Sequence, residues 1–479
     1  MDIADILIEN NRLRAENQQL QREKAALEKR VARLEAELQA LKELLETTRR
    51  KGKRQATPFS KGAPTTTPKK SGQKPGHPAA HRPVPDKVDQ TEEAVLPNVC
   101  PDCGGPIKED EVQAQYQVDI PRPIPVTVTQ FNIHVGHCTA CGVRLQGRHP
   151  AQTSDATGAA AVQIGPNALG LAAELKHEIG VPYGKTAKIL STATDLTVER
   201  STLARASQRL AQKCQPTYAQ LIVRLRQNEV VHVDETGWKI GGHSAWLWVF
   251  TNDDLSLYVI DPSRAHEVVE EILGRDYAGI LVSDCFTAYD PLKCRQGKCV
   301  GHLLRHCKEL QELKSGRAVK FSQTLAELLR KAIALKNRRP QMSAQGYLIA
   351  CGRLEAALDR LLAQPERDED NARFVRTLLK QRARLFTFLY HDAVDPTNNA
   401  AERELRPAVV VRKTGGCNRT DAGADAHAIL ASVLRTCLKQ GYDPVAVLKQ
   451  LLHSAETMIL DLAAPAKAGE LLPPAIASP

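Results

Sequence analysis

Long hydrophobic runs are missing from this sequence of 479 residues. No stretch approaches the ~18 consecutive apolar residues that a membrane-spanning helix needs, so we expect no transmembrane helix. The opening Met-Asp-Ile-Ala-Asp lacks the basic segment and apolar core of a secretory signal, so we expect a cytoplasmic protein. A disulfide pattern is missing as well. Only four of the twelve cysteines form Cys-x-x-Cys pairs, and the scattered remainder suits a reducing compartment.

Apolar residues and positive charge, by contrast, are plentiful. The length allows roughly three domains, and a hydrophobic content of 42% is ample for at least one full core. The formal net charge is +10 and the isoelectric point is about 9.0, which favours a polyanionic partner.

Residues 1–47 carry a heptad repeat. One seam position is occupied almost only by Leu, whereas the other mixes Asn and Lys with apolar residues. The two sets are Ile6, Leu13, Leu20, Leu27, Leu34 and Leu41, and Asn10, Asn17, Lys24, Val31, Leu38 and Leu45. The pattern is typical of a parallel two-stranded coiled coil whose register is set by buried Asn. It predicts a dimerising zipper rather than a lone amphipathic helix.

A basic stretch follows, within residues 48–97. Residues 49–87 contain eleven Lys and Arg against one acidic residue, Asp86, interleaved with Pro, Thr, Ser and Gly. Such a composition cannot bury a core, so we expect a flexible linker. It either follows DNA phosphates or serves only as a soluble connection.

Two Cys-x-x-Cys turns lie within residues 98–150. Cys100-Pro-Asp-Cys103-Gly-Gly and Cys138-Thr-Ala-Cys141-Gly are separated by 34 residues. The segment 116–135 between them alternates and is rich in Val, Ile and Thr, as strands are. Four thiolates at this spacing predict a zinc-ribbon module holding one structural Zn²⁺ through Cys100, Cys103, Cys138 and Cys141. A dithiol redox pair is the alternative, and no βαβ context supports it.

Residues 160–225 have a helical pattern. The segment 183–190, a turn at 193–197 and the segment 199–213 match helix-turn-helix spacing, and the second helix carries several basic residues. A plain helical hairpin has the same features.

From residue 229 the pattern changes to that of strands. The order is strands at 229–234, 244–251 and 255–261, a helix at 265–274, a strand at 279–284 and a helix at 302–314. This is the order of a ribonuclease-H-like sheet, the first part of which we place in residues 226–316. Residues 317–392 predict a helical insertion, residues 393–463 a glutamate-bearing helix with C-terminal helices, and residues 464–479 a tail. The fold class expected is multidomain α/β, with a coiled coil, zinc ribbon and helical DNA-binding segment ahead of a ribonuclease-H-like core.

Two aspartates, Asp234 and Asp284, close the apolar runs 229–234 and 279–284. Alone, each could be an ordinary residue that begins a turn. Two buried carboxylates side by side repel, however, unless a divalent cation lies between them. Glu402 offers a third carboxylate on a helix that also carries Arg406 four residues later; a surface ion pair is the alternative for these two.

Two further groups of residues lie between Asp234 and Glu402. Cys294, Cys299, His302, His306 and Cys307 fit no zinc spacing well, so we expect no second zinc site there. Trp246 and Trp248 share one strand face and are expected in the core rather than as base-stacking platforms.

Several motifs stand out along the second half of the chain. They are Asp234-Glu235-Thr236, the strand ending at Asp284, Cys299-Val-Gly-His302-Leu-Leu-Arg305, and Asn398-Asn399-Ala400-Ala401-Glu402-Arg403 with Leu405-Arg406-Pro407. Together they resemble the DDE transposases of the insertion-sequence-66 family, and the resemblance covers nearly the whole chain. Two departures are Gly237-Trp-Lys-Ile in place of a Pro-rich continuation and Thr414-Gly-Gly-Cys in place of an aromatic segment.

The resemblance implies roles for particular residues. Asp234, Asp284 and Glu402 match the catalytic acids, which would hold two Mg²⁺ or Mn²⁺ ions. The DNA or phosphate contacts expected are His302, Arg305, Arg403, Arg406, Arg412 and Lys413. Cleavage of element ends and transfer of the 3′ ends to target DNA would follow.

The expected partners are the terminal inverted repeats and target DNA, further copies of the chain in a homodimer or higher homo-oligomer, and two small accessory proteins encoded beside it. The protein would then be associated with the bacterial nucleoid. A non-catalytic DNA-binding regulator and a nuclease without joining activity are the alternatives.

Overall fold

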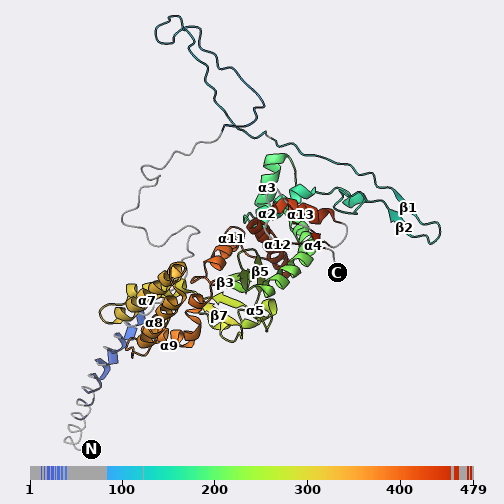
Figure 1. Cartoon of the computed structure of the whole chain (residues 1–479). Coiled ribbons are helices and arrows are strands. Elements are labelled where there is room, and N and C mark those ends of the chain that lie inside the picture. Colours follow the sequence, from blue (N-terminus) through green and yellow to red (C-terminus); the bar gives the residue numbers. More distant parts are fainter. Residues whose placement is uncertain are drawn as a thin grey trace, which may run out of the picture. The chain divides into compact units, whose positions relative to one another are not determined.

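The computed structural model describes residues 84–121, 123–454, 458–462, 472–473 and 475–476, with scattered positions between 12 and 39 (Figure 1). The chain divides into two units, Met1–Ile107 and Lys108–Pro479. Among the described residues, no helix is long and apolar enough to cross a membrane.

In the first unit, the described positions between 12 and 39 are helical. Leu20, Leu27 and Leu34 are 56%, 61% and 50% exposed. A single chain therefore leaves this apolar stripe uncovered at heptad spacing. The other seam residues Ile6, Asn10, Leu13, Asn17, Leu41 and Leu45, and the basic stretch 49–83, lie outside the described residues.

A five-stranded mixed sheet forms the centre of the second unit. Its strands are β3 (Val230–Ile240), β4 (His243–Thr251), β5 (Ser256–Asp261), β6 (Ile280–Ser283) and β7 (Arg295–Lys298). The spatial order is β5-β4-β3-β6-β7. The strands β3, β4 and β5 form an antiparallel meander, whereas β6 and β7 run parallel to β3. The mixed α/β character expected from the sequence is confirmed.

Helices cover both faces of the sheet. On one face, Val231, Val233 and Trp248 pack against α4 (Arg200–Gln227) and α5 (His266–Leu273). On the other, Trp238 and Leu247 pack against α11 (Asn399–Gly415). The sheet is thus buried on both sides, and Asp234, which alternates with Val233 along β3, lies on the side that α11 covers.

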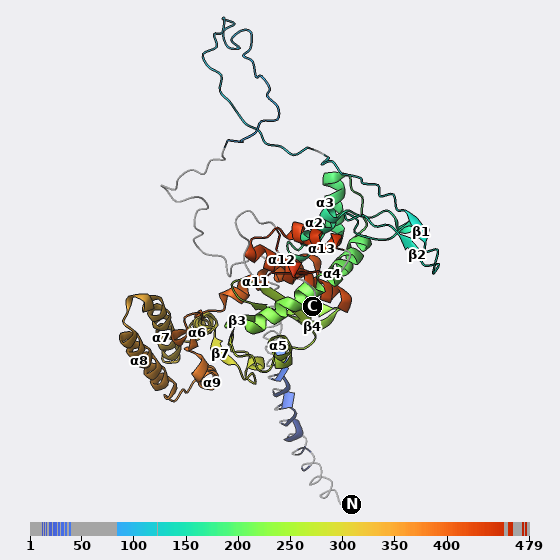
Figure 2. The same ribbon diagram turned by 45° about the vertical axis from the view of Figure 1, so that its right-hand side comes forward.

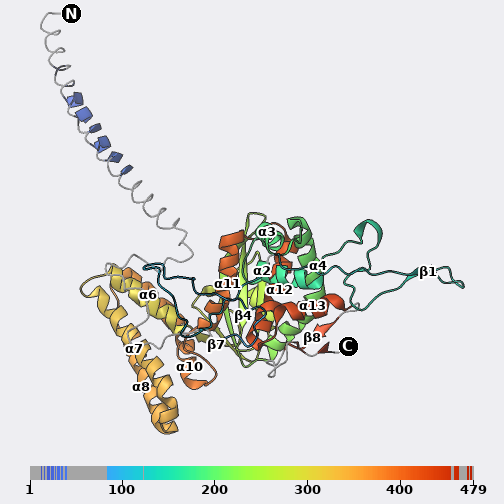
Figure 3. The same ribbon diagram turned by 90° about the horizontal axis from the view of Figure 1, so that it is seen from above.

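The predicted insertion is helical. It consists of α7 (Ala318–Arg338), α8 (Ala344–Leu362), α9 (Glu369–Lys380) and α10 (Thr387–Tyr390), and it shares a core with α6 (Val300–Leu313). These helices gather on the β7 side of the sheet, away from α4, in all three views (Figures 1–3).

The second unit contains further helices and strands. They are β1 (Val135–His137), β2 (Arg144–Gln146), α2 (Pro166–His177), α3 (Tyr183–Thr194), α12 (Asp421–Gln440), α13 (Pro444–His453), β8 (Ile459–Leu460) and β9 (Ala475–Ile476). The helix α12 lies along β5, where Ser432 Oγ accepts a hydrogen bond from Tyr258 N (2.8 Å) and Thr436 Oγ1 accepts one from Ser256 N (3.2 Å). These side chains satisfy backbone donors that an edge strand would otherwise leave open.

Three sequence expectations were wrong in extent. Described residues between 116 and 134 form no strand, because Pro121, Pro123 and Pro125 remove ladder donors and no partner strand is at hand. The strand β3 does not end at Asp234 but continues to Ile240, since its pairing with β4 extends that far. The helix α4 continues past Pro216 to Gln227, because its last turns bury apolar side chains in the core.

A buried ion cluster joins α11 to α12. The Arg435 guanidinium binds Glu404 (3.0 and 3.1 Å) and Glu178 (2.6 Å), and Tyr258 Oη donates to the Glu404 carbonyl oxygen (2.8 Å). The Glu404 side chain is 7% exposed. Removing one partner from such a cluster leaves the other buried and poorly compensated.

Glu404→Gln is therefore expected to lower the free energy of unfolding by about 1–3 kcal/mol, since Arg435 loses a charged partner inside the protein. Urea denaturation at pH 7 measures this. The control is Glu312→Gln, because Glu312 pairs with Lys308 at the surface and the change should alter stability by less than about 1 kcal/mol. Equal denaturation midpoints for the two variants would contradict the expectation.

Candidate active site

Asp234 and Asp284 lie on the same face of the sheet. The parallel pairing of β3 with β6 ends with His232 opposite Val282. Each aspartate comes two residues after its member of this pair, and residues two apart in a strand point to the same side. Asp284 directly follows the last residue of β6. The two carboxylates consequently share the face that α11 covers.

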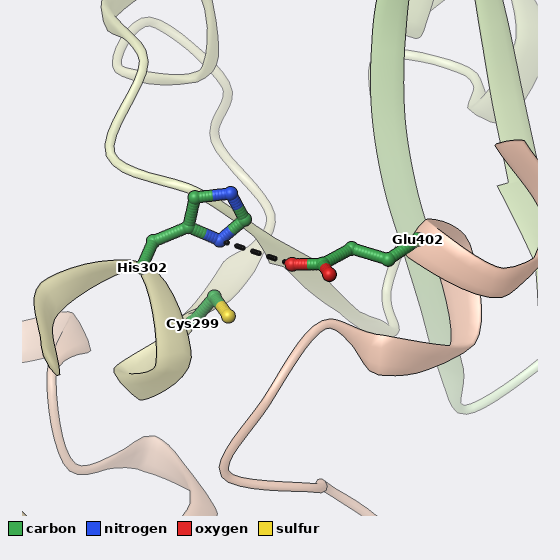
Figure 4. A group of neighbouring side chains, drawn as sticks. All are labelled: Cys299, His302 and Glu402. Atoms are coloured by element: carbon green, nitrogen blue, oxygen red, sulfur yellow. Dashed lines mark ion pairs between the residues drawn. The ribbon is translucent and has the colours of Figure 1, made fainter. Parts of the chain in front are cut away.

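Glu402 reaches this face from the first turn of α11. Its Oε1 lies 3.6 Å from His302 Nδ1 and 3.4 Å from Arg305 Nη2, both on α6. Figure 4 shows the Glu402 and His302 side chains pointing toward one another from the two helices. Two motifs nearly one hundred residues apart in the sequence therefore meet at one carboxylate.

The electrostatics of Asp234 reveal how crowded this acidic site is. Burial raises the pKa of Asp234 to about 7, and the charges of Glu235, Asp284 and Glu402 raise it as well. A hydrogen bond from Glu235 N to Asp234 Oδ1 (2.9 Å) opposes the shift only in part. Among the described residues, no Lys or Arg pairs with Asp234 or Asp284. A divalent cation would supply the positive charge that is missing beside these carboxylates.

Asn398, one residue before α11, fixes the position of that helix. It is fully buried. Its Nδ2 donates to Val233 O (2.8 Å), and its Oδ1 accepts from His232 Nδ1 (3.0 Å). Its backbone N–H donates to Cys299 Sγ (3.0 Å), at the start of α6. One helical turn later, Glu402 N donates to Asn398 O (3.1 Å). Asn398 thus links β3, α6 and the turn that carries Glu402.

Two neighbouring glutamates are held elsewhere. Glu235 points to the opposite sheet face, where Arg264 donates to its Oε1 (2.7 and 3.0 Å) and Tyr289 Oη donates to its Oε2. Glu404 belongs to the Arg435 cluster. Asp234, by contrast, is close enough to Asp284 and Glu402 for both charges to raise its pKa.

The basic residues suggested by the sequence have different surroundings. His302 and Arg305 lie beside Glu402, whereas Arg403 and Arg406 are exposed on α11. Arg412 instead binds β3, donating to Thr236 Oγ1 (3.0 Å) and to Gly237 O. Lys413 is exposed in the last turn of α11.

A cluster of possible metal ligands around Glu402 was not expected from the sequence. Donor atoms of Cys299, His302 and Glu402 lie within 4.8 Å of one another, in the part of the chain that the structure describes (Figure 4). Burial raises the pKa of Cys299, and its sulfur already accepts the Asn398 N–H. A protonated, hydrogen-bonded thiol is a poor metal ligand, so Cys299 is better explained as part of the Asn398 network. This grouping could not be predicted from the sequence, because Glu402 is remote from Cys299 along the chain.

The two Cys-x-x-Cys turns, one in each unit, have the same backbone hydrogen bonds. Cys100 N donates to Gly105 O (2.9 Å) and Cys138 N to Val143 O (2.8 Å). A glycine with positive φ follows each second cysteine, Gly104 at 71° and Gly142 at 73°. Backbone N–H groups, chiefly that of Asp102 in the first turn and that of Cys141 in the second, lower the pKa values of Cys100 and Cys138. Both turns are therefore shaped to present thiolates.

These features define an α/β protein with three carboxylates gathered on one face of a mixed sheet. The sequence model of the Transposase IS66 family matches residues 161–426, more than half of the chain, so the protein belongs to the IS66 family of transposases.

Among curated proteins, similar sequences occur in Sinorhizobium fredii (strain NBRC 101917 / NGR234). The uncharacterized protein y4qI is 25% identical over 308 residues, which cover 58% of this chain and 57% of the relative. The uncharacterized protein y4hP is 24% identical over 414 residues, covering 78% and 73%. The chain thus spans little more than half of y4qI.

Asp234→Asn is expected to stabilise the metal-free protein, and more so at pH 8 than at pH 5. The folded pKa of about 7 exceeds the ordinary value of 3.8, so the folded state retains a proton that the unfolded state releases. The wild-type free energy of unfolding therefore falls between about pH 4 and pH 7, by up to roughly 4 kcal/mol, and then levels off. Asn carries no charge and avoids this loss. Urea denaturation in EDTA at both pH values measures the difference, and an equal gain at both would argue against it.

Proposed function

We propose that the protein cleaves DNA strands at the ends of its element and transfers the 3′ ends to target DNA. Asp234, Asp284 and Glu402 would hold the two divalent cations, Mg²⁺ or Mn²⁺, that this reaction needs. When bound, such a pair activates the attacking oxygen and stabilises the leaving oxygen of an in-line displacement. The observation that carries the proposal is the convergence of three carboxylates, with the pKa of Asp234 raised to about 7, in a protein of a transposase family.

In the first step, water would attack a phosphodiester at the element end, breaking the bond to the 3′ oxygen and leaving a 3′-hydroxyl. That hydroxyl would then attack a target phosphodiester, displacing the target's own 3′ oxygen. Asp234 must lose its proton before it can bind a cation, since the neutral acid is a poor ligand. His302 and Arg305 lie beside Glu402, where they can bind the non-bridging oxygens of the phosphate.

The sheet supports this assignment. Three antiparallel strands followed by two parallel ones, with acids at β3 and after β6, agree with the ribonuclease-H-like core expected from the sequence. We assign that core to residues 226–316 with the glutamate helix in 393–463, interrupted by the insertion in 317–392.

Binding of DNA ends is assigned to the segments before the core. The module in residues 98–150 would hold one structural Zn²⁺ through its four cysteines, and α3 with α4, inside residues 160–225, would form the helix-turn-helix-like segment. Residues 48–97 would add non-specific contacts to phosphates, as would the exposed Arg403, Arg406 and Lys413. The two small accessory proteins and the nucleoid association remain implications of the family.

Glu402→Gln is expected to reduce strand cleavage by at least about 10²–10³-fold, because it removes a charge that opposes the cations while keeping the shape of the side chain. The assay uses a duplex carrying the inverted repeats of the element, Mg²⁺ and the full chain, with nicked and joined products separated on a denaturing gel. Glu312→Gln is the matched control on the exposed face of α6 and should cleave like the wild type.

Undiminished cleavage by Glu402→Gln would remove Glu402 from the metal site. Nicked products without joined ones from the wild type would favour a nuclease, and binding without either product would favour the non-catalytic regulator.

One zinc ion per chain is expected, held by Cys100, Cys103, Cys138 and Cys141, since the two turns match one another and have lowered thiol pKa values. Elemental analysis of protein purified under reducing conditions checks the stoichiometry. Cys138→Ser should lose the metal and weaken end binding, whereas Cys351→Ser, at a buried core thiol, should keep the metal. A metal-free wild-type protein would refute the site.

Pairing of two chains is assigned to the heptad stripe of residues 1–47. Replacing Leu20, Leu27 and Leu34 with Ser should convert a dimer to a monomer, because these exposed side chains find cover only in a second helix. Light scattering after size exclusion measures the mass. Ala25→Ser with Ala32→Ser, at helix positions outside the seam, is the control. An unchanged mass for the triple variant would place the main dimer contact elsewhere.

A further inference from the structure

A groove leads from Asp284 into the space between α6 and α9. Its volume is about 470 Å³, and Asp284 and His302 line one end of it. Along α6 the lining continues with His306 and Leu313, which share a helix face with His302. On the α9 side it is lined by Arg373 and Thr377, on the helical insertion. The insertion therefore forms a wall of a depression that starts at one of the proposed metal ligands.

The lining combines flat apolar surface with polar edges. The His306 ring meets Phe374 edge-on, with ring centroids 4.4 Å apart, and the His306 side chain remains 47% exposed. Two acids of the lining have polar neighbours. Asp370 lies 2.6 Å from Lys314, and Glu309 lies 3.5 Å from His306. The lining holds three carboxylates, those of Asp284, Glu309 and Asp370, against one arginine, Arg373, so the groove suits an uncharged, flat group with hydrogen-bonding edges better than it suits a phosphate.

A nucleobase is an uncharged, flat group with hydrogen-bonding edges, and the position of the groove also favours a nucleobase as its ligand. A strand whose scissile phosphate lies among Asp234, Asp284 and Glu402 must place an adjacent nucleotide near the groove's entrance at Asp284. A base that is stacked and paired within the duplex cannot enter this groove. Unstacking a base costs a few kcal/mol and is cheapest where pairing is already weak, as at a cleaved end.

We propose that the groove between α6 and α9 binds an unstacked base of the nucleotide next to the scissile phosphate. The inference rests on the proposed function and extends it by giving the helical insertion a part in substrate binding. Aromatic and imidazole rings such as that of His306 stack on bases with little sequence preference, while Arg373 and Thr377 offer hydrogen bonds to the base edge.

The test uses the full chain and an element-end duplex with 2-aminopurine, whose fluorescence rises on unstacking, next to the scissile phosphate. Ca²⁺ replaces Mg²⁺ for the binding measurement. The wild type should raise the fluorescence several-fold. Thr377→Trp fills the groove, so it should abolish the rise and reduce Mg²⁺-dependent cleavage at least tenfold. Leu379→Trp places the same side chain at an exposed position on α9 outside the lining and should behave like the wild type.

An abasic nucleotide at the same position separates groove filling from misfolding. It should restore cleavage by Thr377→Trp to near the wild-type rate, since no base then needs the groove. A variant that stays inactive on the abasic duplex overturns the proposal, as does normal cleavage of the intact duplex by Thr377→Trp. His306→Ala, a smaller change, should halve the fluorescence rise or more, and an unchanged rise counts against the proposal. If the wild type cleaves normally while these results fail, the groove proposal falls alone; if the wild type cleaves nothing, the proposed function falls with it.

Discussion

The hydrogen bonds of Asn398 hold the candidate active site together. Its side chain binds the backbone of β3 beside Asp234, and its main chain binds Cys299 at the start of α6 and begins the turn that carries Glu402. The partners on β3 are more than 160 residues away in the sequence. Because Asn398 is fully buried, each of these groups would be costly to leave unsatisfied, so the position of α11 against the sheet is strongly specified.

Because side chains alternate along β3, the neighbouring acids Asp234 and Glu235 point to opposite faces of the sheet. Asp234 faces α11 among other carboxylates and is paired with no Lys or Arg of the described chain. Its neighbour Glu235 faces the opposite core and is neutralised by Arg264. A single strand thus carries one carboxylate that is neutralised by a neighbour and one whose charge is costly in the folded protein. Such local instability is common where a site is built for charge that the protein itself does not supply.

Features that depend on neighbouring residues in the chain could be predicted from the sequence, whereas features that depend on tertiary contacts could not. The apolar runs before Asp234 and Asp284 predicted β6 and the start of β3, and helical period predicted the insertion. The strand β7 was missed because Arg295-Gln-Gly-Lys298 has no apolar pattern; its side chains are polar yet mostly buried through tertiary contacts. The role of Asn398 could not be inferred, since its partners are set by the fold. The burial of Glu404 was equally hidden, because its partner Arg435 lies on another helix. The roles of the acids, the zinc site and the zipper remain predictions.

The side chains of Ser432 and Thr436 occupy the backbone donors along the outer edge of β5, and they come from a helix near the C-terminal end of the described chain. During synthesis on the ribosome, the whole meander emerges well before α12 does. For that interval the edge of the sheet is open to any strand that can pair with it. A chain that stops before residue 432 keeps that edge open permanently. Truncated products of this gene should therefore be prone to aggregation even when all five strands of the central sheet and every candidate catalytic acid are present.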